Sequence, residues 1–170
     1  MLMAGCSKQD DYHPAPGAFK QAKSITLYEQ GVGFTGRHKY EKAIERFTQV
    51  LELDPNFIEA YLARGNSYTE IRKHAEALAD FNKALQLDPS MKKNPEYIYI
   101  FRDMSVCHVA LKQWNEAVDD SNIMIALNKK YEWAYMARSV AYAGLGKKAE
   151  SDRDAAEYER LQKEFEKSED

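Results

Sequence analysis

The sequence predicts an all-α fold, a solenoid of about four stacked helix-turn-helix repeats, and three observations lead to this prediction. Shifting the chain against itself by 34 residues aligns EKAIERFTQVLELDPNF with AEALADFNKALQLDPSM. Small residues recur at matching positions of the two helices in each repeat. The pairs Asp54-Pro55 and Asp88-Pro89 are expected to end one helix and start the next, because proline does not continue a helix.

The register of the repeats follows from these positions. Pro55 and Pro89 occupy the same late position in two units, and Ala117 aligns with Ala43 and Ala77 to define a third. A fourth unit follows directly and continues into a C-terminal capping helix, whose charged faces suit contact with solvent. The predicted organisation is residues 1–23 as a leading segment and flexible tether, 24–57, 58–91, 98–131 and 132–165 as the four units, 92–97 as an insertion, and 166–170 as a frayed tail.

Each predicted hairpin has a small residue on its first helix and another on its second. Two helix backbones approach closely only where no bulky side chain lies between them, so these residues are expected to face each other where the helices cross. Phe47 and Phe81 are expected to fill the space under the next unit. The small residues are Gly31, Gly65, Ser105 and Ser139 on the first helices, and Ala43, Ala77, Ala117 and Ser151 on the second helices.

The insertion before the third unit is predicted to be a loop that leads into a helix. Asn94 is a suitable helix N-cap, and Pro95 suits the first helical turn. We therefore expect Asn94 to cap a lengthened first helix of the third unit.

These residues and spacings closely resemble the tetratricopeptide repeat over residues 24–165. The first two units match closely. The third unit departs from the pattern at Ser121 and Lys129, and the fourth at Ala155 and in the shifted run Lys147-Lys148-Ala149. The resemblance implies eight antiparallel helices in a right-handed superhelical solenoid, with the first helix of each unit lining a concave groove.

The resemblance also implies that this groove binds a partner protein or peptide. The aromatic, methionine and arginine side chains expected there are types enriched at binding hot spots. The second half of the groove is the favoured anchor, because the first half offers mainly Glu29, Glu59 and Glu70 around Leu62. The candidate groove residues are Tyr28, Val32, Leu62, Asn66, Tyr99, Arg102, Asp103, Val106, Trp133, Met136 and Val140.

One mode of recognition in this family is not expected. Family members that bind chaperone tails clamp a C-terminal carboxylate with lysine and asparagine side chains on successive first helices. The matching positions of this sequence hold Tyr28, Val32, Ala63, Tyr99 and Asp103.

The N-terminal residues Met3-Ala4-Gly5-Cys6-Ser7 resemble a lipobox, in which the cysteine is acylated and becomes the mature N-terminus. A lipobox normally follows a basic and an apolar stretch. Acylation of Cys6 would attach the chain to the periplasmic side of a bacterial outer membrane, where repeat lipoproteins assist the assembly of surface or cell-wall complexes. The alternative is a cysteine placed there by chance in a cytoplasmic adaptor or co-chaperone without a lipid.

Other functional classes find little support in the composition. The net charge of -3 and the pI near 5.9 provide no basic surface for nucleic acid. We find no metal-ligand spacing, cofactor motif or catalytic set, and we expect neither an enzyme nor a cofactor. Cys107 is predicted to be a packing residue, because His108, the next residue of a helix, points about 100° away. The oligomeric state stays open.

Overall fold

The computed structural model describes residues 16–169, which form eight α-helices and no β-strand, as predicted for an all-α fold. Two short 3-10 helices, η1 and η2, separate the second pair of α-helices from the third. The helices are α1 (Pro16–Thr35), α2 (Tyr40–Leu53), α3 (Ile58–Glu70), α4 (His74–Leu87), η1 (Pro89–Lys93), η2 (Pro95–Tyr97), α5 (Ile98–Ala110), α6 (Trp114–Leu127), α7 (Glu132–Gly144) and α8 (Lys148–Glu169).

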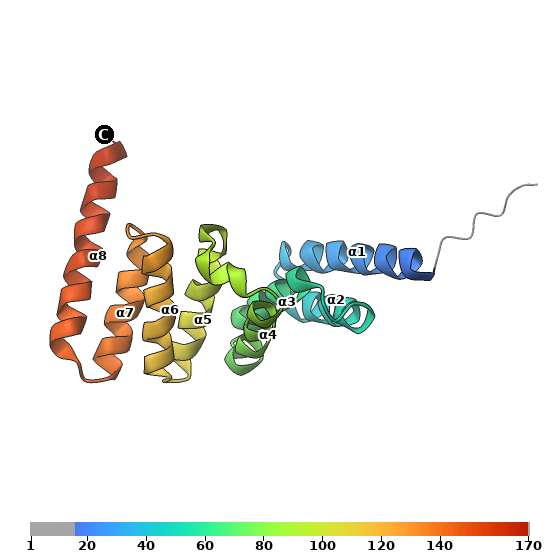
Figure 1. The fold of residues 1–170 in the computed structure, drawn as a ribbon, viewed down its shortest axis with the longest axis horizontal. Helices are drawn as coiled ribbons and strands as arrows, with labels where there is room; N and C mark the ends of the chain where they lie inside the picture. The colour runs from blue at the N-terminus through green and yellow to red at the C-terminus, as the bar shows by residue number, and fades with distance from the viewer. Residues whose placement is uncertain (1–15, 170) are drawn as a thin grey trace, which may run out of the picture.

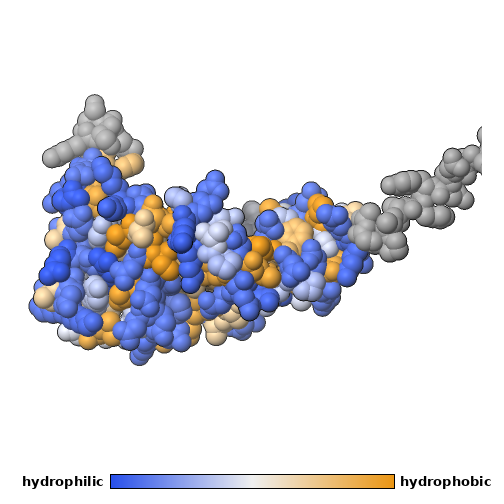
Figure 2. All heavy atoms as spheres, in the orientation of Figure 1, coloured by the Kyte–Doolittle hydropathy of each residue, from blue (hydrophilic) through white to orange (hydrophobic). Residues whose placement is uncertain are grey.

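Consecutive helices form four hairpins that stack in chain order into an elongated solenoid (Figure 1). The stack twists along its length, since α1 runs along the long axis of the molecule whereas α5 to α8 run across it. The face drawn in Figure 2 carries apolar surface over α6 and α7, beside the largely hydrophilic α8. The hydrophilic α8 therefore closes the C-terminal end of the stack, as expected for a cap.

The solenoid curves because the contacts between units are more extensive in the layer of first helices than in the layer of second helices. Each first helix contacts the first helix of the next unit, α1 with α3, α3 with α5 and α5 with α7. Within the described residues, neighbouring second helices do not contact one another to the same extent. The first helices are therefore closer together and line the concave side.

The hairpin crossings are tightly packed. In the first two units, however, the side chains nearest to the glycines are phenylalanines and not the small residues that the sequence predicted. Ala43, Ala77 and Ala117 are fully buried, as expected. A Cβ atom added to Gly31, however, would lie 2.4 Å from the ring of Phe47, and one added to Gly65 would lie 2.8 Å from the ring of Phe81. In the first two units the glycines thus make room for phenylalanine rings of the second helices.

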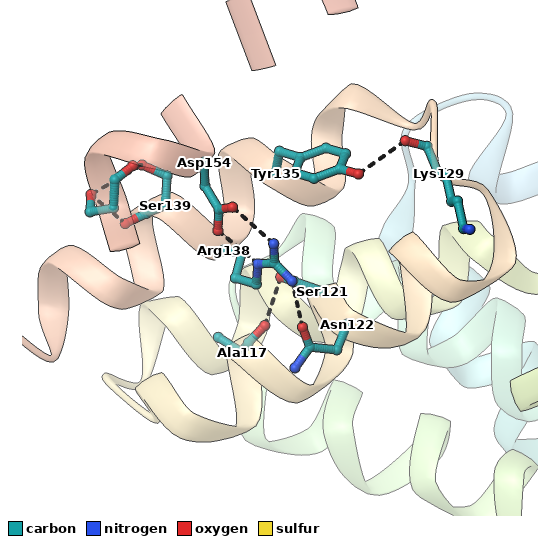
Figure 3. Close-up of polar contacts among 9 residues, drawn as sticks. Ala117, Ser121, Asn122, Lys129, Tyr135, Arg138, Ser139 and Asp154 are labelled. Atoms are coloured by element: carbon teal, nitrogen blue, oxygen red, sulfur yellow. Dashed lines mark hydrogen bonds and ion pairs between the residues drawn. The ribbon is translucent and has the colours of Figure 1, made fainter. Parts of the chain in front are cut away.

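The fourth unit has the pairing of small residues that the sequence predicted. Ser139 Oγ donates to the backbone carbonyl of Ser151, and Ser151 Oγ donates to the carbonyl of Ser139, each over 2.9 Å. Two small side chains here hold α7 against α8 through reciprocal hydrogen bonds (Figure 3).

The insertion forms 3-10 turns and does not lengthen the following helix. Asn94 Oδ1 accepts a hydrogen bond from the Glu96 backbone N–H at 3.0 Å, so Asn94 is a cap, but it caps η2. Helix α5 begins only at Ile98 and has 13 residues, the same length as α3. The prediction of a lengthened helix is therefore wrong.

Two predicted boundaries also differ from the structure. The flexible tether was predicted to reach Lys23, but α1 already begins at Pro16. The tail was predicted to fray from residue 166, but α8 continues to Glu169. The candidate lipid attachment residue Cys6 lies outside the described residues. In residues 16–169 no helix has the length and apolar character needed to cross a bilayer.

Candidate functional site

Four of the predicted groove residues line one apolar groove on the concave side, between α5 and α7. They are joined by Ser105, which was predicted as a small residue of a hairpin crossing, and by two residues that the sequence analysis did not single out, and the groove has a volume of about 140 Å³. We call it the α5–α7 groove and define it by its lining residues Ser105, Val106, Val109, Trp133, Met136, Ala137 and Val140.

The α7 wall of the groove is a stripe of side chains on one helix face. Trp133, Met136 and Val140 follow one another at intervals of three and four residues, which places them on the same side of a helix. Trp133 is 42% exposed and Val140 is 45% exposed. Val106, 41% exposed, faces them from α5. Contiguous exposed apolar surface of this kind is typical of interaction sites.

The floor of the groove contains an unsatisfied polar group. The Oγ atom of Ser105 is buried and has no hydrogen-bond partner. Buried serines elsewhere in the helices, such as Ser67 and Ser121, donate to the backbone carbonyl four residues earlier. Leaving a buried hydroxyl unpaired costs roughly 1 to 3 kcal/mol. Ser105 thus brings a polar group without a partner to an otherwise apolar groove.

A cluster of aromatic and charged side chains lies on α5 and at the start of α7. The guanidinium of Arg102 lies 5.2 Å from the ring centroid of Tyr99 and forms a 2.9 Å ion pair with Asp103. Tyr99 is 57% exposed and meets Tyr131 edge to face, with ring centroids 6.2 Å apart. Arg102 is thus held in a fixed orientation by neighbours on both sides.

The carboxyl group of Asp103 lies in an electrostatically unfavourable place. Burial raises the pKa of Asp103, Arg102 lowers it, and the nearby carboxylate of Glu70 raises it further, so that the net shift is upward. The carboxylate of Asp103 is therefore not fully compensated by Arg102.

The first half of the predicted groove is partly used for packing. Tyr28 stacks on Phe57 with ring centroids 5.2 Å apart and also contacts Phe47. Leu62 is half-buried and packs against the core. Val32 and Asn66 are exposed. Tyr28 and Leu62 therefore contribute to the stacking of units. They differ in this from the accessible groove residues around α5 and α7.

Sequence reasoning missed two arginines that each connect three helices. Arg64 on α3 forms two 2.8 Å hydrogen bonds with Asp80 of α4, and one of 2.9 Å with Thr48 of α2. We call such an arrangement an arginine lock, because it joins a unit to the second helix of the preceding unit.

A second arginine lock has the same design at the other end of the array (Figure 3). Arg138 on α7 bonds Asp154 of α8 at 2.7 and 2.8 Å and Asn122 of α6 at 2.7 Å. Arg64 and Arg138 hold the same position in their repeats, and each precedes its aspartate by 16 residues. That recurrence is the sequence signal that would have revealed the locks.

The third unit lacks this lock. Met104 stands at the position of the arginine, and Asp120 instead pairs with Nδ1 of His108 at 2.7 Å within the same hairpin. A cleft of about 290 Å³ opens here beside α4, and both Met104 and His108 line it. The joint between the second and third units is thus held by apolar packing and by the insertion, without an arginine.

Cys107 has the environment of a packing residue. It is fully buried, its sulfur lies 3.5 Å from the hydroxyl of Thr69, and burial raises the pKa of its thiol. A reactive cysteine requires a lowered pKa and access to solvent. His108, the nearest candidate base in sequence, is paired with Asp120.

Comparisons with known proteins match the repeats and the fold. A family model described as tetratricopeptide repeat matches residues 58–91, and one described as TPR repeat matches residues 34–71. Tetratricopeptide repeats are therefore confirmed in this part of the chain. No curated protein matches the sequence.

Solved structures extend the likeness to most of the chain. The crystal structure of MamA is 17% identical, with a TM-score of 0.75 over 91% of this chain and 99% of that chain. The second TPR domain of human RPAP3, in complex with the HSP70 peptide SGPTIEEVD, is 27% identical, with a TM-score of 0.62 over 72% of this chain and 97% of that chain. The first TPR of Spaghetti (RPAP3), bound to the HSP90 peptide SRMEEVD, is 24% identical, with a TM-score of 0.65 over 74% of this chain and 94% of that chain.

Proposed function

We propose that this tetratricopeptide-repeat solenoid is a protein-interaction scaffold that binds a segment of a partner protein in the α5–α7 groove. The observation that carries the proposal is the stripe of Trp133, Met136 and Val140 on α7. Trp133 and Val140 are exposed to solvent opposite Val106, and Met136 lies half-buried between them. Apolar side chains placed this way gain free energy when a partner covers them.

The size of the groove suits a single large side chain. Its volume of about 140 Å³ is close to that of a cavity of about 150 Å³ that accommodates benzene. One leucine, methionine or phenylalanine of the partner therefore fills the groove, and the neighbouring residues of the partner lie over its edges.

The two RPAP3 structures, in which repeats of this type hold short peptides, support a peptide as the partner. The chemistry of recognition differs in this chain. Asp103 and Tyr99 stand at positions where carboxylate-clamping relatives are expected to carry lysine or asparagine, so a free C-terminal carboxylate is not the anchor.

A displayed library of random dodecapeptides, selected on the full-length chain, tests the site of binding. Trp133→Ala is expected to weaken recovered peptides by about 2 kcal/mol, or roughly 30-fold in affinity, because it removes the largest wall of the groove. Leu111→Ala is the matched control, since Leu111, 41% exposed, is about as accessible as Trp133 but does not line the groove. Undiminished affinity after truncation of both Trp133 and Tyr99 would place recognition on another face.

We also propose that the scaffold is anchored in a bacterial cell envelope through an acylated Cys6, where it assists the assembly of a surface or cell-wall complex. The support is the lipobox-like run from Met3 to Ser7. In a Gram-negative host the gene product is expected to fractionate with membranes, and Cys6→Ser is expected to release it. An unmodified Cys6 in the mass of the mature protein would favour the alternative, a cytoplasmic adaptor without a lipid.

A further inference from the structure

We propose that the partner segment is extended and basic, with an apolar side chain in the α5–α7 groove and a lysine or arginine about three residues away that pairs with Glu70 and Asp103. This inference rests on the proposed function and specifies the partner. It follows from the charges of the concave side, from the unsatisfied hydroxyl of Ser105 and from the spacing of the helices.

The concave side has an excess of negative charge. Glu29, Glu59 and Glu70 are exposed on the first helices, and Asp103 is half-buried on α5. Arg102 is a cation on the same face, and its guanidinium already pairs with Asp103. The other two arginines of these helices in the described repeats, at positions 64 and 138, are directed to the second helices by the arginine locks.

The carboxylates of Glu70 and Asp103 are close enough to influence each other across the α3–α5 contact. Thr69, the neighbour of Glu70, lies 3.5 Å from the sulfur of Cys107, one helical turn after Asp103. The carboxylate of Glu70 accordingly adds a small contribution to the upward pKa shift that burial causes at Asp103. A cationic group placed between the two carboxylates would relieve their repulsion. Such a group would gain from both carboxylates, although Glu70 also interacts with the hydroxyl of Tyr40.

The unsatisfied hydroxyl favours an extended segment over a helical one. A helix satisfies its own backbone groups, whereas an extended segment presents free N–H and C=O groups along both edges. Ser105 lines the groove and has a buried Oγ atom without a partner. A backbone carbonyl or N–H of the segment can supply that partner.

The spacing between the apolar anchor and the basic residue follows from standard dimensions. The α3–α5 contact is about one helix diameter from the α5–α7 groove, and packed helices are about 8 to 10 Å apart. An extended chain advances about 3.3 Å per residue. A basic side chain about three residues from the anchor therefore reaches Glu70 and Asp103.

An acidic segment is disfavoured by the same charges. The peptides in the two RPAP3 structures both end in Glu-Glu-Val-Asp. Such a segment would bring further carboxylates next to Glu70 and Asp103, and juxtaposed like charges disfavour a partner at an interface. The charge preference of this chain is thus expected to be opposite to that of these neighbours.

The test uses the dodecapeptide library on the full-length chain. Recovered peptides are expected to contain leucine, methionine or phenylalanine with lysine or arginine three or four residues away. Replacing that basic residue by glutamate in a synthetic peptide is expected to reduce affinity at least about tenfold, and Glu70→Gln combined with Asp103→Asn to reduce it by a similar factor. Glu116→Gln is the matched control, because Glu116 is exposed on α6, away from the groove.

The possible results separate this inference from the proposed function. Peptides that require Trp133 but carry no basic residue, or carry an acidic one, overturn the inference and leave the proposed function standing. Peptides whose binding is unaffected by Trp133→Ala, or a library that yields no binding peptide, overturn the proposed function and the inference with it. Basic peptides that bind Glu70→Gln/Asp103→Asn as tightly as the unaltered chain overturn the assigned charge contact.

Discussion

Two glycines of α1, only two positions apart in the chain, have opposite surroundings. A Cβ atom at Gly31 would lie 2.4 Å from the ring of Phe47, whereas a Cβ atom at Gly33 would meet nothing within 4 Å. Glycine is therefore required at the first position by close packing, and at the second position it only weakens the helix.

Alanine substitutions at these two positions are expected to change stability in opposite directions. Gly31→Ala is expected to lower the free energy of unfolding by about 1 to 3 kcal/mol, because Phe47 must move in a packed core. Gly33→Ala is expected to raise it by about 0.5 kcal/mol through its better helix propensity. Urea unfolding followed by circular dichroism measures both, and equal midpoints for the two variants would contradict the packing described for the first hairpin.

The buried thiol gives a second prediction for a single residue. With Cys6→Ser as background, Cys107 is expected to resist iodoacetamide in the folded chain, because burial both shields the sulfur and raises its pKa. Labelling is expected to become complete once urea unfolds the chain. Mass spectrometry follows the reaction, and rapid labelling without urea would mean that α5 is not packed against α3 as described.

The joint between α4 and α5 is built differently from the other joints between units. Arginine locks hold α3 against α2 and α7 against α6, whereas Met104 occupies the corresponding position of α5. Helix α4 also touches α5 less extensively than α2 touches α3 or α6 touches α7. The four units therefore form two locked pairs.

Installing the missing lock is expected to stabilise the middle joint. In the other locks the arginine lies over a tyrosine, and His108 occupies the position of that tyrosine in the third unit. Asp120 and Asn82 already stand at the positions of the two acceptors that a new arginine would need. Met104→Arg combined with His108→Tyr is expected to raise the free energy of unfolding by about 1 kcal/mol.

Met104→Arg alone is the control for this double substitution, because His108 still occupies Asp120 in that variant. It is expected to be less stable than the double variant, because Asp120 still pairs with His108 and is not available to the new guanidinium. Thermal unfolding of the three proteins checks the order. A double variant less stable than the single one would mean that the insertion holds α4 and α5 in a different relative orientation from the locked joints.

The sequence predicted the repeats and the open part of the groove better than it predicted the joints between units. Periodic positions such as Ala43 and Ala77 determine which face of a helix is buried within its own hairpin. By the same rule Trp133 and Val140 were expected outside the packed face, and both are exposed, while their role in binding stays a prediction. The contact of Tyr28 with Phe57, which directly precedes α3, could not be predicted from the pattern of α1 alone. The locks were missed because each requires three helices to come together.

At the scale of the whole molecule, the unlocked joint is expected to open more readily than the rest of the array. In a stack of repeats, stability is nearly a sum of units and of the contacts between neighbours, so that the weakest contact opens first. Hydrogen exchange is expected to be faster in η1, η2 and the first turn of α5 than in the centre of α7. The Met104→Arg/His108→Tyr variant is expected to slow it, and uniform exchange along the chain would argue against a weak joint.

The unequal contact between the two layers of helices has a mechanical consequence. In a curved stack whose units contact one another mainly through the inner helices, these inner contacts separate first when the two ends are pulled apart. Tension along this solenoid would therefore separate α3 from α5, at the joint without an arginine lock, before it affects the outer helices. It would move Glu70 away from Asp103, where the basic residue of the partner is proposed to bind. We expect a bound peptide to dissociate faster when optical tweezers stretch the chain through handles at its two ends. A scaffold built in this way would hold its partner in the absence of tension and release the partner when tension acts on the chain.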